Sequence, residues 1–333
     1  MKAIFLSEKK EKIFQVYAPE TVQTLQRLLD VEKHGYTKAD ILREPSACSH
    51  TEIIFSTWGM PSFSEEEIRT YFPSLKAIFY AAGSVQKFAR PFLACGVRIF
   101  SAWAANAVPV AEYTVSQILL ANKGFYAHTR LMAERMVSDA RALTARYPGN
   151  YGVRIGLVGC GMIGSLVAQM LKAYHLEVAV YDPYLSPERT KTLGVTLCSL
   201  EELFSTCGVV SNHLPNLDAT KRMLRYEHFS SMVPYATFLN TGRGAQVVEA
   251  ELVRILRERP DLTAVLDVTD PEPADLSHPF YTLPNCFLTP HIAGSLGNEV
   301  ARMGEYMAEE LVRYLEGSRT DYEVTLNMLE TMA

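Results

Sequence analysis

The stretch from Arg154 to Asp182, RIGLVGCGMIGSLVAQMLKAYHLEVAVYD, decides the fold. Its apolar start, residues 154–158, predicts a buried strand, and the glycine-rich turn that follows opens a helix reaching about residue 174. A second apolar run, residues 178–181, predicts another buried strand that ends in an acidic residue. This strand, helix and strand order is the context that a G-x-G-x-x-G dinucleotide fingerprint requires.

Three glycines carry this fingerprint, and each has its own geometric role. Gly159 permits the tight turn, Gly161 lets the backbone approach a pyrophosphate, and Gly164 lets the helix pack close to the strand. The N-terminus of the helix, at Met162 and Ile163, then faces the phosphates.

The acidic residue Asp182 follows Gly164 by 18 residues, close to the roughly 20 expected for a ribose ligand. Its carboxylate would accept hydrogen bonds from ribose hydroxyls and would repel a 2′-phosphate, so NAD rather than NADP is the expected cofactor. The alternative is a glycine-rich turn in another α/β protein, with Asp182 only capping the strand end.

Composition narrows the class of protein. The chain has 333 residues, 48% of them hydrophobic, and a net charge of −5. The absence of a basic run argues against nucleic acid and acidic membranes, and no apolar stretch reaches the length of a membrane span. The six cysteines contain no C-x-x-C pair, which suits free thiols in the cytoplasm rather than a disulfide framework or a zinc site.

Strands and helices alternate along most of the chain, which predicts an α/β fold with two doubly wound parallel sheets. A long apolar helix, residues 109–123, and a more polar helical stretch, residues 128–146, bridge the two. A closing helix with one apolar face stops at Gly317 and is expected to return to the first domain. The predicted domains are residues 1–102 plus 297–333, which bind substrate, and residues 103–296, which bind NAD.

Charged side chains follow three predicted strands of the second domain. Ligands bind outside the carboxyl ends of parallel strands, so Arg243, Glu272 and His291 are expected to point toward the cofactor crevice. Arg243 offers a planar fork for a carboxylate, and His291 is the natural acid and base beside a hydride-transferring nicotinamide. Glu272 would orient the imidazole. Each residue taken singly also has an ordinary explanation: Arg243 as a surface arginine, Glu272 as a loop residue and His291 as a structural histidine.

At these residues the sequence resembles a known family, the D-isomer-specific 2-hydroxyacid dehydrogenases. The resemblance covers nearly the whole chain and is strongest from Asn106 to Gly294. The motifs that carry it are N-A-x-x-V-A-E (106–112), G-x-G-x-x-G with Asp182-Pro183, H-L-P (213–215), N-T-x-R-G (240–244), D-V-x-x-x-E-P (267–273) and T-P-H-I-A-G (289–294).

The resemblance implies a flavodoxin-like substrate domain, a Rossmann NAD-binding domain and a homodimer held partly by the bridging helix. It makes Arg243, Glu272 and His291 the catalytic residues, with no metal. Cofactor contacts beyond the fingerprint and Asp182 are expected at His213, Pro215, Thr241, Gly242 and Asp267. Substrate contacts are expected at Trp58, Ala82, Gly83 and Asn106.

Some positions depart from the family or stay open. Gly242 stands where alanine or serine is common in the family. The loop around Ala82 and Gly83 lacks the acidic residue that the family often has there. The backbone N–H groups of Ala82 and Gly83 could still bind a substrate carboxylate. His213 fits either the cofactor wall or simple packing. Trp58 fits either a wall of the substrate cleft or an ordinary packed tryptophan.

Two functions from different classes remain. The first is an NAD-dependent enzyme that interconverts a small D-2-hydroxy acid and its 2-oxo acid, with glyoxylate or hydroxypyruvate reductases and phosphoglycerate dehydrogenases as main candidates. Formate dehydrogenases fit less well, because they have glutamine where this chain has Glu272. The second is a nucleotide-sensing binding protein like the corepressors that share this fold.

Overall fold

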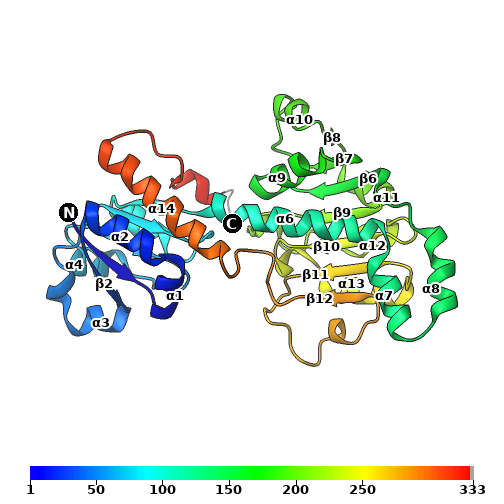
Figure 1. Cartoon of the computed structure of the whole chain (residues 1–333), viewed down its shortest axis with the longest axis horizontal. Coiled ribbons are helices and arrows are strands. Elements are labelled where there is room, and N and C mark those ends of the chain that lie inside the picture. Colours follow the sequence, from blue (N-terminus) through cyan, green and yellow to red (C-terminus); the bar gives the residue numbers. More distant parts are fainter. Residues whose placement is uncertain (331–333) are drawn as a thin grey trace. The chain divides into compact units, whose positions relative to one another are not determined.

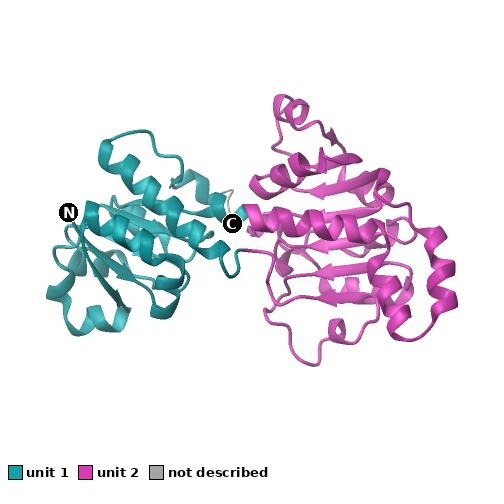
Figure 2. Ribbon diagram, viewed as in Figure 1, with its two compact units in different colours: residues 1–107, 295–333 teal, residues 108–294 magenta. Residues whose placement is uncertain are grey.

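The computed structural model describes residues 1–330. The chain divides into two compact units, Met1–Ala107 with Ser295–Ala333 and Val108–Gly294 (Figure 2). Residues 331–333, the end of the predicted substrate domain, lie outside the described part. Unit 1 is therefore built from both ends of the chain, and unit 2 is an insertion within it.

Unit 1 contains a six-stranded sheet in the order β13-β5-β4-β3-β1-β2. Its strands are parallel except β13, which pairs antiparallel with β5. The sequence did not predict β2, an edge strand whose residues DVEKHGY are mostly exposed and polar, or the two-residue β13. The strand bounds are β1 Lys2–Leu6, β2 Asp30–Tyr36, β3 Ile53–Ser56, β4 Ala77–Tyr80, β5 Arg98–Ser101 and β13 Glu323–Val324.

Helices cover both faces of this sheet (Figure 1). The last helix, α14, buries Met303, Met307 and Leu311 in the same core as strand residues Phe79 and Phe100, and it contacts α1 and α2. It ends at a left-handed glycine, residue 317, as its sequence predicted. The helices of unit 1 are α1 Lys10–Val16, α2 Pro19–Leu28, α3 Lys38–Arg43, α4 Glu65–Tyr71, α5 Ala89–Ala94 and α14 Glu299–Glu316.

Unit 2 contains a seven-stranded parallel sheet in the order β12-β11-β10-β9-β6-β7-β8. Five strand ends are in register, since Val158, Asn212, Asn240, Leu266 and Leu288 pair in turn across β6, β9, β10, β11 and β12. The segments that leave these strands therefore start along one edge. The strand bounds are β6 Tyr151–Val158, β7 His175–Tyr181, β8 Thr196–Leu197, β9 Val209–Asn212, β10 Thr237–Asn240, β11 Thr263–Leu266 and β12 Cys286–Leu288.

Helices also cover both faces of the second sheet, so the prediction of two doubly wound parallel sheets is confirmed. The bridging helix α6 (Trp103–Asn122) begins earlier than predicted, which places Pro109 inside it. The stretch predicted as one helix, residues 128–146, is broken at Arg135, whose φ is 62°. The other helices of unit 2 are α7 Phe125–Ala133, α8 Val137–Leu143, α9 Met162–Leu171, α10 Pro187–Leu193, α11 Leu200–Thr206, α12 Tyr226–Ser231 and α13 Glu249–Glu258.

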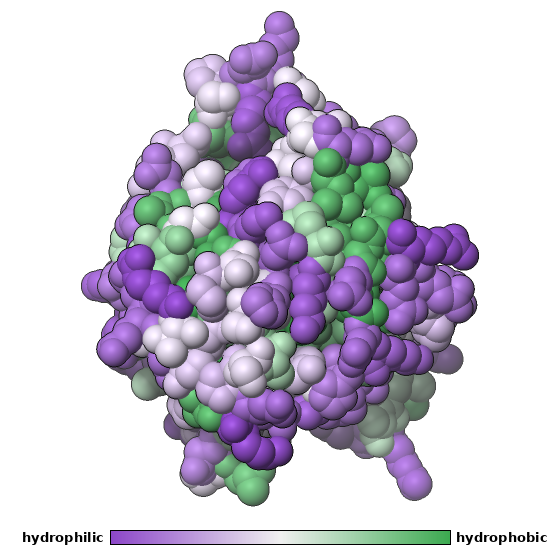
Figure 3. Space-filling model, turned by 90° about the vertical axis from the view of Figure 1, so that its left-hand side faces the viewer, coloured by the Kyte–Doolittle hydropathy of each residue, from purple (hydrophilic) through white to green (hydrophobic). Residues whose placement is uncertain are grey.

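Hydrophilic residues cover most of the face drawn in Figure 3. Within residues 1–330, no helix is long and apolar enough to cross a membrane. The same residues hold no group of three or more His, Cys, Asp or Glu side chains placed to bind a metal. All six cysteines are free thiols.

Candidate active site

The glycine turn after β6 has the backbone geometry of a dinucleotide site. Gly159 has a φ of +91°, a conformation that other residues rarely adopt. A methyl group at Gly164 would overlap the Gly159 carbonyl, while one at Gly161 would meet nothing within 4 Å. Gly161 also precedes α9 without any side-chain cap, which leaves the first N–H groups of α9 to an outside partner. The turn thus fits the pyrophosphate of a dinucleotide.

Asp182, directly after β7, is fixed beside this turn. Its Oδ2 accepts a hydrogen bond from the backbone N–H of Cys160 at 2.7 Å, and its Oδ1 accepts one from Tyr184 N–H at 2.8 Å. Each carboxylate oxygen keeps further acceptor capacity for ribose hydroxyls. Two backbone donors thus hold the carboxylate next to the glycine turn, where an adenosine ribose requires it.

Replacing Asp182 by alanine is expected to raise the KM for NADH by about 10- to 100-fold, the loss of hydrogen bonds to one charged group. Discrimination against NADPH should fall as well, because the charge that repels a 2′-phosphate is gone. Steady-state kinetics with both cofactors test this, with Glu188→Ala, an exposed carboxylate on α10, as the control. An unchanged KM for NADH, with NADPH still refused, would contradict it.

His291 and Glu272 form a direct pair. Nδ1 of His291 lies 2.5 Å from Oε1 of Glu272, and both side chains are more than a third exposed, at 44% and 38%. His291 has a φ of 56°, in the left-handed region. The two residues follow different strands, β12 and β11. The structure therefore brings together two of the three predicted catalytic side chains.

Asp267 holds the segment that carries His291. Only 2% of Asp267 is exposed. Its Oδ1 accepts hydrogen bonds from Thr289 Oγ1 at 2.6 Å and Ile292 N–H at 2.8 Å, and its Oδ2 accepts one from Ala293 N–H at 2.9 Å. This carboxylate thus fixes the chain on both sides of His291. The sequence predicted a cofactor contact at Asp267. That contact stays a prediction.

Arg243 follows β10 on a tightly packed loop. Its Nη1 donates to the carbonyl of Gly242 at 2.7 Å. Burial lowers the pKa of the guanidinium, and the nearby Glu272 carboxylate opposes that shift. A methyl group at Gly244 would overlap the backbone of Thr269 and Asp270. The loop that carries Arg243 therefore lies directly against the segment that leads to Glu272.

His213 packs beside the glycine turn. A Cβ at Gly159 would lie 3.0 Å from the His213 carbonyl. The Nε2 of His213 lies 2.9 Å from Ser211 Oγ, while Nδ1 is buried and has no hydrogen-bond partner among the described residues. Burial lowers the pKa of this imidazole to about 4, so it is neutral near pH 7. The buried, unpartnered nitrogen favours a role in the cofactor wall, which stays a prediction.

Glu249, which the sequence did not single out, anchors the segment that carries Glu272. This first residue of α13 accepts a hydrogen bond from Asp270 N–H at 2.9 Å, and its side chain is only 11% exposed. The Nε2 of His278 is 3.6 Å from its other oxygen, beyond direct hydrogen-bonding distance. Burial raises the pKa of the Glu249 carboxyl to about 7. No motif in the sequence marks this carboxylate, because only the fold buries it.

Glu249→Gln is expected to be more stable than the natural chain at pH 8, by about 1–3 kcal/mol. The raised pKa means that the folded state prefers the protonated carboxyl, so ionisation destabilises the fold as pH rises from about 4.5 through about 7. The amide oxygen can still accept from Asp270 N–H. Urea denaturation at pH 5 and pH 8 measures the difference, with exposed Glu305→Gln as control. An equal effect at both pH values would contradict it.

The predicted substrate residues all lie in unit 1. Ala82 N–H donates to the Tyr80 carbonyl at 2.9 Å, so this group, one of the two expected to bind a carboxylate, is already paired. The Nδ2 of Asn106 is 3.7 Å from the position of a Cβ on Gly83. Trp58 is half-buried against both hydrophobic clusters of unit 1. Of the predicted set, Gly83 and Asn106 thus lie together.

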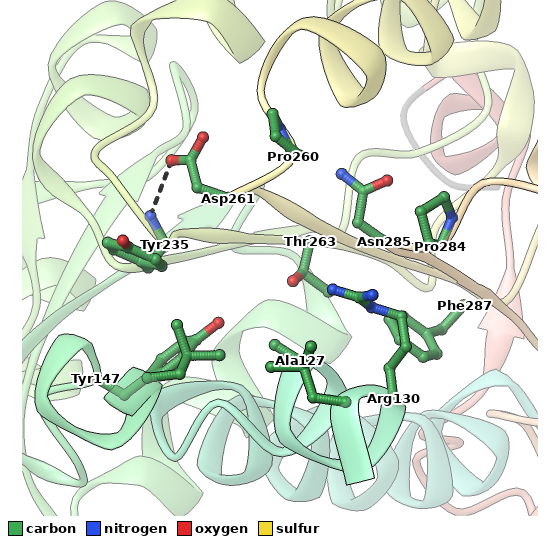
Figure 4. Close-up of a pocket in the computed structure, with 12 residues that line it drawn as sticks. Ala127, Arg130, Tyr147, Tyr235, Pro260, Asp261, Thr263, Pro284, Asn285 and Phe287 are labelled. Atoms are coloured by element: carbon green, nitrogen blue, oxygen red, sulfur yellow. Dashed lines mark hydrogen bonds between the residues drawn. The ribbon is translucent and has the colours of Figure 1, made fainter. Parts of the chain in front are cut away.

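A cavity of about 140 Å³ lies elsewhere in unit 2 (Figure 4). Its lining includes Thr263, the first residue of β11, and Asn285, which precedes β12. Tyr235, whose N–H donates to Asp261, precedes β10. These are the amino ends of the strands, whereas Arg243 and His291 follow the carboxyl ends. This cavity is therefore separate from the candidate catalytic residues.

The parallel sheet, the glycine turn, the Asp182 carboxylate beside it and the Glu272–His291 pair point to a class, the two-domain α/β proteins that bind a nicotinamide dinucleotide. Within that class the chain belongs to the D-isomer specific 2-hydroxyacid dehydrogenases, since the model of that family's NAD-binding domain matches residues 115–293.

Relatives and solved structures agree with this family. The chain is 29% identical over 237 residues to a D-3-phosphoglycerate dehydrogenase of Archaeoglobus fulgidus, and the match covers 71% of the chain and 44% of that protein. It is 36% identical over 166 residues to a glyoxylate reductase of Aeropyrum pernix, covering 50% of each. The chain thus spans about half or less of the length of these curated relatives.

Two solved structures illustrate the likeness in fold. The TT0316 protein of Thermus thermophilus has a TM-score of 0.72 and 28% identity, covering 97% of this chain and all of that one. The D-mandelate dehydrogenase of Rhodotorula graminis has a TM-score of 0.82 at 19% identity, covering 97% of both chains. At that identity it shows the fold alone, which is the one that the sequence predicted.

Proposed function

We propose that the protein is an NAD-dependent oxidoreductase that interconverts a small D-2-hydroxy acid and its 2-oxo acid. The observation that carries this proposal is the pairing of His291 with Glu272 at strand ends of the sheet that also bears the glycine turn. The family match supports it.

The chain's own residues would bind the acid and move its proton. Bound nicotinamide supplies or accepts the hydride. Glu272 holds Nδ1 of His291, so Nε2 is the nitrogen that we assign to the substrate oxygen: it donates a proton to the carbonyl in reduction and takes the hydroxyl proton in oxidation. Arg243 binds the carboxylate or carbonyl through its planar fork. Substrate contacts at Trp58, Ala82, Gly83 and Asn106 stay predictions.

The relatives named above favour two substrates. A glyoxylate reductase implies a very small oxo acid, and the phosphoglycerate dehydrogenases imply a phosphorylated one. We propose that the acid is one of these or a close analogue, such as hydroxypyruvate.

NADH consumption by the purified protein tests the proposal with a panel of oxo acids: glyoxylate, hydroxypyruvate, pyruvate, phosphohydroxypyruvate, and branched and aromatic members. Turnover of one member that is lost in His291→Asn supports the dehydrogenase and gives the size of the pocket. If every member fails while NADH still binds, the nucleotide-sensing alternative gains, and retention of a protein partner in the presence of NADH would support it.

We further propose a homodimer formed through unit 2. Four large apolar side chains on or beside α7 and α8 are 42–52% exposed, namely Phe125, Met132, Met136 and Val137. Burying them against a second copy would remove apolar area from water. Light scattering after size-exclusion chromatography should give a dimer for the natural chain and a monomer for Met132→Glu/Met136→Glu. A natural chain that is monomeric at high concentration would contradict this.

A further inference from the structure

Three buried amide side chains lie under the loop that carries Arg243. Asn212 ends β9, Asn240 ends β10, and Gln246 follows the loop. Their exposed fractions are 0%, 1% and 0%. Asn212 Nδ2 donates to Asn240 Oδ1 at 3.0 Å and to Gln246 Oε1 at 2.5 Å. The three side chains thus link the ends of two neighbouring strands to the residue that follows the loop.

Gln246 uses all of its hydrogen-bonding capacity in this place. Its Oε1 accepts from Asn212 Nδ2 and from the backbone N–H of Arg243 at 3.1 Å. Its Nε2 donates to the carbonyls of Leu214 at 2.6 Å and Pro215 at 2.9 Å. A side-chain amide has two donor hydrogens and two acceptor sites, so each is satisfied.

The other two amides bind the same loop. Asn240 Oδ1 accepts from Gly242 N–H at 3.1 Å, and Asn240 Nδ2 donates to the Arg243 carbonyl at 3.2 Å. A Cβ at Gly242 would lie 2.8 Å from Gln246 Oε1 and 3.0 Å from Asn212 Nδ2. The N–H and carbonyl of Arg243 are therefore both held by this network, and the network fills the space beside Gly242.

We propose that Gln246, held in place by Asn212, is a positioning residue that sets the place of Arg243 relative to residues 213–215, which follow the neighbouring strand β9. This inference rests on the proposed function. The side chain of Gln246 is fully buried, and its four hydrogen-bond partners are all groups of the protein. It acts through the backbone of Arg243 on one side and of Leu214 and Pro215 on the other, and so fixes the two loops that follow β9 and β10 to each other.

Burial gives this network its effect. A hydrogen bond in a low-dielectric interior is stronger than one in water, and a buried polar group left without a partner is costly. Gln246→Leu removes one side chain and leaves four groups without that partner: Asn212 Nδ2, Arg243 N–H, and the carbonyls of Leu214 and Pro215. The loop then shifts to find new partners, and a shift of about 1 Å in a substrate-binding group costs about 10²-fold in rate.

The central experiment compares Gln246→Leu with Asn285→Leu. Asn285 is also a buried amide, 6% exposed, whose Nδ2 donates to three backbone carbonyls, those of Leu256 in α13 and of Arg259 and Leu262 between α13 and β11. We expect Gln246→Leu to lower kcat/KM for the oxo acid by about 10- to 100-fold. Asn285→Leu should lose stability but keep its kcat/KM.

A double-mutant cycle separates positioning from general damage. If Gln246 acts through Arg243, adding Gln246→Leu to Arg243→Lys should lower kcat/KM by less than about 3-fold beyond Arg243→Lys alone, because coupled residues are not additive. Independent, multiplying losses would overturn the proposal. So would a folded Gln246→Leu variant with natural kcat/KM.

A second variant serves if Gln246→Leu fails to fold. In Gln246→Glu an acceptor oxygen replaces the donor that faces the carbonyls of Leu214 and Pro215. Protonation restores one donor, so kcat/KM relative to the natural chain at the same pH should rise as pH falls, and hydrogen exchange of residues 241–247 should slow. A flat ratio with unchanged exchange would overturn the proposal. A natural chain that turns over no oxo acid contradicts the proposed function itself.

Discussion

Replacing His291 by asparagine is expected to lower kcat by about 10²- to 10⁴-fold, the usual worth of a general acid or base. Asparagine cannot hold or deliver the proton, yet it tolerates the left-handed φ of 56° at this position better than alanine does. NADH affinity should stay near its natural value, because the Asp267 carboxylate holds this segment through the N–H groups of Ile292 and Ala293. The loss is therefore one of chemistry rather than of folding.

Single-turnover and steady-state rates with the best oxo acid of the panel provide the measurement. His34→Asn, which changes an exposed histidine of β2, is the matched control and should keep its full rate. If His291→Asn keeps more than about a tenth of kcat, His291 is not the general acid or base. A loss of less than about 10-fold is smaller than the 10²- to 10⁴-fold contribution of such a group.

Arg243→Lys should lower kcat/KM by about 10²- to 10³-fold, the cost of losing one well-placed donor to the developing charge. Lysine keeps the charge but offers a point donor in place of a planar fork, so bidentate capture of a carboxylate is lost. The backbone N–H of residue 243 would still bond to Gln246, so the loop itself should hold.

Kinetics across oxo acids of different size, with folding checked by thermal denaturation, measure this effect. Arg254→Lys, at an arginine of α13 that is 64% exposed and pairs with Glu258, is the control for a surface arginine. A natural kcat/KM in Arg243→Lys would mean that another group binds the acid.

The sequence predicted the sheet of unit 2 well, because glycines and strand ends are local signals. The turn at Gly159 needs a positive φ, and apolar runs of four or five residues mark buried parallel strands. Since parallel strands align their carboxyl ends, the positions of Glu272 and His291 after two strands were enough to predict that the structure would bring them together.

Other features depend on contacts that no local pattern encodes. The edge strand β2 is polar and so lacks the apolar signal, and the break at Arg135 has no glycine or proline to announce it. The paired N–H of Ala82 depends on a turn that periodicity does not describe.

The amides under Arg243 are the clearest case. Asn212 and Gln246 are 34 residues apart and meet only in the folded sheet. In the sequence, Gly242 only departs from the alanine or serine that is common in the family. The structure explains this glycine, because the side chains of Asn212 and Gln246 occupy the space that a methyl group would need.

The split chain path of unit 1 sets an order of events during synthesis. Its sheet has β5 next to β13, and its core needs α14, yet both elements are translated only after the whole of residues 108–294. Domains fold as units while the chain emerges, so unit 2 can fold first. Until α14 has been synthesised, Phe79 and Phe100 lack the Tyr314 ring that packs against both. During synthesis the first hundred residues therefore keep apolar surface exposed until α14 and β13 have been made and can pack against them.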